Sequence, residues 1–181
     1  MVKKILAVIL SLMILTFTAA ALAATNSKTN TDISGADVVD VEGDGDLLLQ
    51  LVKTADTEAT QKIKDALTEA QKAGDVLGAF PEDIRAQIPE EHKAVNEMET
   101  VRFEGDLDKV VKAKVRFKFE TPYKEGDEVT VLLGFPEEDE VAEWIVLDGE
   151  GTEEGDVEFT ITQNILSMIK TDPFVIVPVS K

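Results

Sequence analysis

The fold is decided by the stretch VKAKVRFKF, which covers residues 111–119. Apolar and basic residues alternate along it, and successive side chains of a β-strand point to opposite faces of the sheet. The pattern therefore predicts a strand with one buried face and one solvated face. Its solvated face, here called the basic row, consists of Lys112, Lys114, Arg116 and Lys118.

Other segments of the C-terminal half alternate in the same way, and turn-forming sequence separates them. Short strands at a spacing of about ten residues are typical of an antiparallel sandwich or open barrel. Pro178 indicates that the last strand lies at an edge or ends there, because proline cannot donate a ladder hydrogen bond. The strands expected beside residues 111–119 begin near Val101 and then cover residues 127–135, 141–147, 157–161 and 174–179, with a turn at 149–155.

The preceding part of the chain has a helical period. Between Thr57 and Gly74 apolar residues recur at spacings of three and four, with Asp56 or Thr57 placed as N-cap and Gly74 as the C-terminal glycine. We therefore expect the class α+β. An N-terminal helical segment, residues 36–97, would be followed by a C-terminal antiparallel β-sandwich, residues 98–181.

The first 23 residues have the three zones of a secretory signal peptide. Lys3 and Lys4 give a basic start, an apolar run follows, and Ala21-Leu22-Ala23 fits the small-residue rule for cleavage. The apolar run is shorter than the roughly 20 residues that a membrane helix needs. We expect a secreted, extracellular protein cleaved near Ala23, followed by a flexible polar leader at residues 24–35; an uncleaved N-terminal anchor is the alternative.

The composition excludes several classes of function. The chain has 36 acidic and 18 basic side chains and a net charge of −18, which makes nucleic acid and anionic membranes poor partners. It has no cysteine, so thiol nucleophiles and zinc–thiolate sites are excluded. Its one histidine, His92, lies in a charged stretch and is expected to be exposed. Without a catalytic motif in the sequence, we expect that the protein is not an enzyme.

The basic row is a candidate binding surface. One interpretation is that an adjacent strand carrying Asp156 and Glu158 balances it through cross-strand pairs, and this interpretation is favoured. The alternative is a surface for an anionic polymer or an acidic partner. Two aromatic residues are further candidates: Tyr123, expected to be exposed in a turn, and Trp144, expected in the core rather than on a binding platform.

Calcium is the one metal that the sequence leaves open. Residues 40–46 follow the first half of an EF-hand loop, but Leu51 stands where a bidentate glutamate is required. We expect no cofactor, with weak calcium binding as the alternative. The candidate ligands are Asp40, Glu42, Asp44 and Asp46.

A family resemblance covers about residues 115–180. It is carried by Thr121-Pro122-Tyr123, by the single Trp144 before Leu147-Asp148-Gly149, and by the closing apolar residues 173–177. This part resembles uncharacterised immunoglobulin-like and fibronectin-like β-sandwich modules of secreted Gram-positive bacterial proteins. The resemblance implies a non-catalytic binding or structural module that acts at or beyond the cell envelope on an extracellular protein or a cell-surface polymer. The alternatives are a calcium-dependent adhesive or carbohydrate-binding domain and a small carboxylate-based hydrolase.

Overall fold

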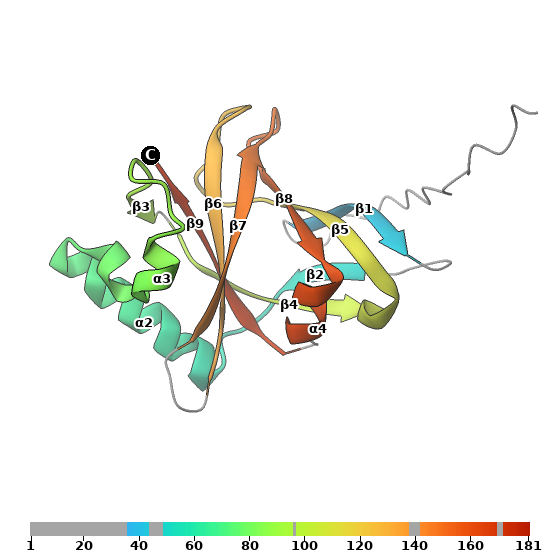
Figure 1. The fold of residues 1–181 in the computed structure, drawn as a ribbon, viewed down its shortest axis with the longest axis horizontal. Coiled ribbons are helices and arrows are strands. Elements are labelled where there is room, and N and C mark those ends of the chain that lie inside the picture. Colours follow the sequence, from blue (N-terminus) through green and yellow to red (C-terminus); the bar gives the residue numbers. More distant parts are fainter. Residues whose placement is uncertain (1–35, 44–48, 96, 138–141, 170–171) are drawn as a thin grey trace, which may run out of the picture.

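The described residues form one antiparallel sheet that curls into a nearly closed barrel (Figure 1). The computed structural model describes residues 36–43, 49–95, 97–137, 142–169 and 172–181. The predicted signal peptide (1–23) and leader (24–35) lie outside these residues. The strands are β1 (Ala36–Gly43), β2 (Leu49–Lys53), β3 (Ala94–Val95), β4 (Glu99–Gly105), β5 (Val110–Phe117), β6 (Glu128–Phe135), β7 (Glu143–Gly151), β8 (Val157–Thr162) and β9 (Phe174–Ser180).

The strands of the described part are hydrogen-bonded in the order β1-β5-β8-β7-β6-β9-β4-β2, with β3 beside β9. Residues of the two end strands, β1 and β2, approach within 8 Å between Cα atoms, which nearly closes the barrel. The helical elements lie between strands in the chain: α2 (Glu58–Ala73), η1 (Val76–Ala79), α3 (Glu82–Arg85), η2 (Leu107–Lys109) and α4 (Gln163–Ile169). None of the helices in the described part is long and apolar enough to cross a membrane.

The expected class, a helical segment at 36–97 followed by a β-sandwich, is wrong. Residues 36–43 and 49–53 are strands of the same sheet, because β1 pairs with β5 and β2 pairs with β4. The helical period did predict α2, which begins after the N-cap Thr57 and ends at Gly74 with φ 78°. The helices therefore lie in the middle of a mostly β chain, and the sheet draws strands from both sides of them.

The strand predicted from residues 111–119 forms as β5, with one irregularity. β1 pairs Glu42 with Lys112 and Gly43 with Val110, so Val111 is an extra residue in the ladder. Such a β-bulge turns its side chain out of the regular alternation. Val111 is accordingly 55% exposed, and Val110 takes the place on the buried face that the alternation predicted for Val111.

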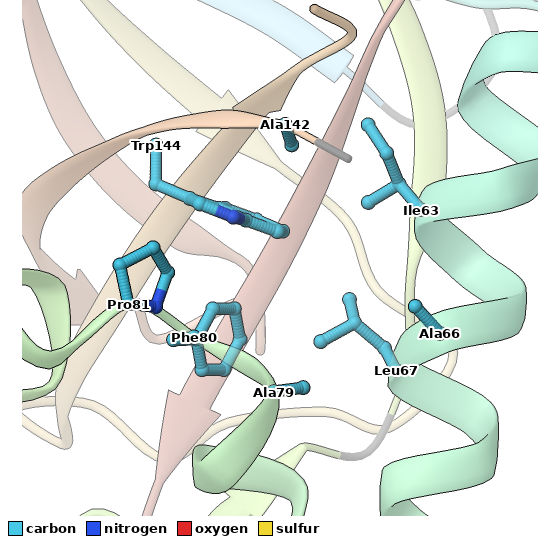
Figure 2. Close-up of a pocket in the computed structure, with 8 residues that line it drawn as sticks. All are labelled: Ile63, Ala66, Leu67, Ala79, Phe80, Pro81, Ala142 and Trp144. Carbon is cyan, nitrogen blue, oxygen red and sulfur yellow. The ribbon is translucent and has the colours of Figure 1, made fainter. Parts of the chain in front are cut away.

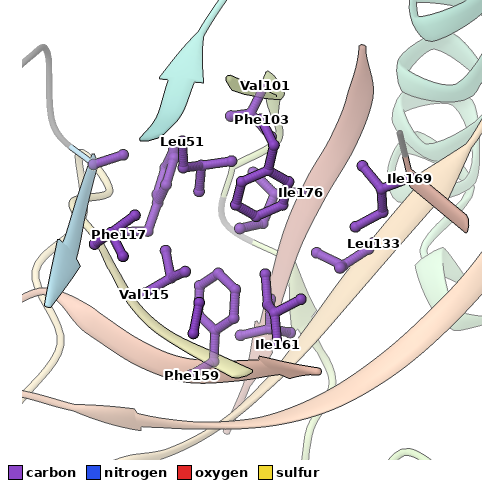
Figure 3. Close-up of a cluster of buried hydrophobic side chains, with 14 of the residues drawn as sticks. Leu51, Val101, Phe103, Val115, Phe117, Leu133, Phe159, Ile161, Ile169 and Ile176 are labelled. Atoms are coloured by element: carbon purple, nitrogen blue, oxygen red, sulfur yellow. The ribbon is translucent and has the colours of Figure 1, made fainter. Parts of the chain in front are cut away.

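Side chains fill the interior of the barrel (Figure 3). Val115 and Phe117 of β5 face Phe103 of β4 across the core, and the rings of Phe103 and Phe174 stack with their centroids 5.7 Å apart. α4 adds Leu166 and Ile169 to the same cluster. The barrel is therefore a packed core, as in other small barrels, and a binding site has to be sought on its outer surface.

β9 is buried on both faces. Phe174 and Ile176 belong to the interior cluster, whereas Val175, Val177 and Val179 belong to a second cluster on the outer face of the barrel. This outer cluster is formed with the helical elements that follow β2, as Figure 1 shows for α2 and α3. Ile63, Leu67, Phe80, Ile84 and Ile88 are its members from these elements and the turn after them.

Pro178 predicted that this strand lies at an edge of the sheet, and that prediction is wrong. β9 pairs with β6 on one side and with β4 and β3 on the other. The carbonyl of Ser180 accepts a hydrogen bond from the N–H of Lys93, so by alternation the nitrogen of Pro178 faces the same side. Pro178 lies between residues 174–176, which pair with β4, and residues 179–180, which pair with β3, so it interrupts neither of these ladders.

His92, which was expected to be exposed, is 2% exposed. The chain returns to the sheet at β3, and this return places the imidazole against the outer face of β6. Its Nδ1 lies 2.9 Å from the hydroxyl oxygen of Thr130, which is also buried. The pair therefore fixes the segment after α3 to the barrel wall.

Thr130→Val should lower the free energy of unfolding by about 1–3 kcal/mol, because it keeps the shape of the side chain and leaves a buried imidazole nitrogen without its partner. Urea denaturation measures the difference. Thr160→Val is the matched control on β8, where the side chain is half-buried and only a change of about 0.5 kcal/mol is expected. Equal losses in the two variants would contradict the role of the His92–Thr130 pair.

Candidate functional site

A pocket of about 340 Å³ opens on the outer face of the barrel, between α2, the η1–α3 segment and the start of β7. Figure 2 shows the rings of Trp144 and Phe80 on one side and the side chains of Ile63 and Leu67 across from them. Pockets of this size with apolar and aromatic walls are the usual form of a small-ligand site. The lining residues are Ile63, Ala66, Leu67, Ala79, Phe80, Pro81, Ala142 and Trp144.

The pocket exists because large side chains form its floor and small ones its mouth. Ile63 and Leu67, four residues apart on one face of α2, are fully buried against the barrel. Ala66 and Ala79 are exposed, and their short side chains leave the space between α2 and η1 unfilled. The pocket is thus open to solvent at the alanines, and the side chains that line it are apolar or aromatic.

The indole of Trp144 is held in place from two directions. Gly134 is its register partner on β6, and a Cβ atom at position 134 would lie 2.7 Å from two atoms of the indole ring. The ring therefore lies directly on the glycine backbone. Phe80 meets it edge-on, with centroids 4.8 Å apart and the planes at 83°. Such aromatic pairs contribute about 0.5–1.5 kcal/mol beyond area burial, so the ring is positioned before any ligand arrives.

The two aromatic candidates have different surroundings. Trp144 is half-buried: it packs on the outer core cluster and also lines the pocket. Tyr123 is 8% exposed, so its expected exposure is wrong. Its N–H donates to the carbonyl of Gly155 at 3.0 Å, and its ring packs against Phe119 with centroids 6.1 Å apart. The turn predicted at Pro122 thus folds the tyrosine into the core.

The basic row lies on the outer face of β5, with Lys118 exposed just after the strand. On the β8 side Glu158 pairs with both Lys114 and Arg116, the latter at 3.4 Å. On the other side β1 places Asp40 opposite Lys114 and Glu42 opposite Lys112. The row is therefore flanked by acidic side chains along both edges, and it lies two strands away from Trp144 in the sheet.

The candidate calcium ligands are only partly described. Asp40 and Glu42 belong to β1, where they face the basic row rather than a loop, and Asp44 and Asp46 lie outside the described residues. Within the described ranges no group of three or more histidine, aspartate and glutamate side chains could hold a metal ion.

Two carboxyl groups of the described residues, those of Asp56 and Glu97, have shifted pKa values. Burial raises the pKa of Glu97, although its carboxylate accepts the N–H of Glu120 at 2.7 and 2.8 Å. For Asp56 burial acts in the same direction, but hydrogen bonds from Thr100 and Lys64 outweigh it and lower the pKa. These acids are engaged by other groups of the protein, and none of them lines the apolar pocket.

The chain matches no protein-family model, no curated protein and no solved structure. The resemblance of residues 115–180 to immunoglobulin-like modules therefore stays a prediction. Sequence reasoning named Trp144 but missed Phe80 and Gly134, whose contribution depends on the register of β6 and β7 and on the return of the chain after α2.

Gly134→Ala should displace the indole of Trp144, because the added methyl would occupy the space of the ring. Trp144 is the single tryptophan of the chain, so its emission maximum reports the displacement directly. Gly149→Ala is the matched control, since its Cβ would meet Val131 and Val157 instead. Both variants should lose stability, by roughly 1–3 kcal/mol, but only Gly134→Ala should shift the emission. Unchanged emission in Gly134→Ala would contradict the geometry described.

The two shifted carboxyls predict opposite pH dependences. The pKa of Glu97 is raised above 4.5 on folding, so the ionised carboxylate destabilises the folded state at neutral pH. Glu97→Gln should therefore unfold at a higher temperature than the wild type at neutral pH. Below pH 4.5 the two proteins should unfold at the same temperature, because the carboxyl group of Glu97 is then protonated in both states. The pKa of Asp56 is lowered below 3.8 on folding, so its ionised carboxylate stabilises the folded state. Asp56→Asn should therefore unfold at a lower temperature than the wild type at neutral pH. This difference in unfolding temperature should disappear as the pH falls below 3.8. Thermal unfolding at both pH values measures this, and parallel shifts in the two variants would refute it.

Proposed function

We propose that this protein is an exported, non-catalytic binding module, and that the pocket beneath α2 receives an uncharged apolar group of its ligand. The observation that carries the proposal is the Trp144–Phe80 pair, held edge-to-face at the wall of an open apolar pocket. An aromatic wall that is already in position loses little conformational entropy when a ligand binds.

The lining of the pocket sets the class of group that would enter. None of the eight lining residues carries a charge, a nucleophile or a proton-transfer group. A charged group would lose its hydration there without gaining a partner, which is strongly unfavourable. An aromatic ring or a branched aliphatic group of a protein side chain or of a surface polymer meets the requirement, and binding rather than chemistry is the activity supported.

The proposed location rests on the sequence of residues 1–23. A basic start, a short apolar run and a small-residue cleavage signal indicate export. Cleavage near Ala23 would remove two lysines and no acids, which makes the net charge two units more negative than −18. A strongly acidic surface keeps an exported protein soluble and leaves the apolar pocket as its distinct docking feature.

Titration with toluene and cyclohexanol tests the proposal, with the emission of Trp144 as the signal. Both probes should change the emission in a saturable way, because the indole is part of the pocket wall. Ala66→Phe should abolish the change, because the larger ring fills the mouth. Ala73→Phe, on the exposed end of the same helix and outside the lining, should leave it intact.

Two results would sink the proposal. One is the absence of a saturable emission change with either probe in the wild-type protein. The other is an equal response in Ala66→Phe and Ala73→Phe, which would place the binding elsewhere. Circular dichroism of both variants shows that a lost signal does not come from unfolding.

A further inference from the structure

Two thirds of β7 has a neighbouring strand on only one side within the described residues. The whole of β6 pairs with β7, from Glu143 to Glu150 of β7. β8 pairs with β7 only at residues 149–151 and then diverges from it. Residues 143–148, here called the open edge, therefore have no described ladder on the side away from β6, and Figure 1 shows β7 and β8 separating there.

The separation is built into the packing of the two strands. A Cβ atom at Gly149 would lie 2.9 Å from the side chain of Val131 and 3.0 Å from that of Val157, so glycine permits the close approach at this point. Beyond it β8 leads directly into α4, whose Leu166 and Ile169 are fully buried in the interior cluster. The opening is thus held by core contacts on the β8 side.

The backbone groups that face the opening follow from the alternation of the ladder. Gly151 exchanges hydrogen bonds with the segment before β6: its N–H donates to Asp127 at 2.8 Å and its carbonyl accepts from Gly126 at 2.9 Å. Odd-numbered residues of β7 therefore face β6, and even-numbered ones face away. The N–H and C=O groups of Trp144, Val146 and Asp148 point to the open side.

The side chains of the open edge suit an added strand. Ile145, Val146 and Leu147 are only half-buried, whereas the exposed residues Glu143 and Asp148 stand at the two ends. Natural edge strands are commonly protected by lysine, proline or a bulge. The stretch from 143 to 148 contains no lysine or proline, and its register with β6 is continuous.

We propose that the open edge binds an extended segment of a partner protein by β-augmentation, with apolar residues at the centre of that segment and lysine or arginine near its ends. Backbone pairing to Trp144, Val146 and Asp148 would supply affinity, and Glu143 and Asp148 would select the basic flanks. A second copy of this chain fits less well, because two copies that each carry a net charge of −18 repel one another. The pocket uses the ring of Trp144 and the open edge uses its backbone, so Ala66→Phe tests the first proposal and Val146→Pro tests the second.

Fluorescence anisotropy of the full chain with a labelled peptide that has valine at its centre and lysine near both ends tests the proposal. A peptide of the same pattern with glutamate in place of lysine is the control for charge. The lysine peptide should bind and lose affinity with added salt, and the glutamate peptide should not bind. No binding of the lysine peptide, or equal binding of the two peptides, would overturn the proposal.

A pair of variants tests the backbone pairing itself. Val146→Pro removes an N–H that faces the opening and leaves the ladder to β6 intact, as edge strands allow. Val146→Ala removes a similar amount of packing and keeps the N–H. The proline variant should bind the lysine peptide about tenfold more weakly than the alanine variant, as expected for the loss of one hydrogen bond of about 1.4 kcal/mol. Equal affinity of the two variants would overturn the assignment.

If circular dichroism shows that Val146→Pro does not fold, the double variant Glu143→Gln/Asp148→Asn decides the matter. It should weaken binding of the lysine peptide and flatten its salt dependence, because both exposed carboxylates of the edge are neutralised. An unchanged salt dependence would overturn the charge selection. Sedimentation of the wild-type chain without peptide gives the last check, since a dimer that Val146→Pro dissociates would assign the edge to a second copy instead.

Discussion

The burial of β9 on both faces is the constraint on which the rest of the structure depends. A strand that is apolar on both sides needs a layer on each: the barrel interior covers Phe174 and Ile176, and the helical elements after β2 cover Val175 and Val177. Full burial of such side chains contributes about 1.5–3 kcal/mol each. The chain has no cysteine, so no disulfide joins the two layers.

The two candidate surfaces follow from how far this outer layer extends. α2, η1 and α3 cover β9 and reach the start of β7, where the small residues Ala66 and Ala79 leave the apolar pocket. On the other side of β7, within the described residues, the ladder to β8 covers residues 149–151 only, and the open edge begins there. Trp144 lies at the boundary, with its ring over β6 and its backbone on the open side.

Local periodicity predicted much of the secondary structure but not its assembly. The alternation at 111–119 and the capped helical repeat from Thr57 to Gly74 gave β5 and α2, because each element is encoded in neighbouring residues. β1 was missed, since its acids resemble a calcium loop until register places Asp40 and Glu42 beside the lysines of β5. The Trp144 pocket was out of reach for the same reason: Phe80 and Gly134 meet the indole only through long-range contacts. The sequence did contain one sign that β9 is buried on both faces: residues 174–179 are apolar without alternation.

Native-state hydrogen exchange of the β9 amides tests the central claim most directly. If β9 joins the two layers, the amides of Val175, Ile176 and Val177 should exchange only through global unfolding, with a free energy equal to that from urea denaturation. Exchange of these amides at a markedly lower free energy, while the amides of β5 stay fully protected, would contradict it. That result would show that the barrel keeps its core without β9 and the helices packed on it.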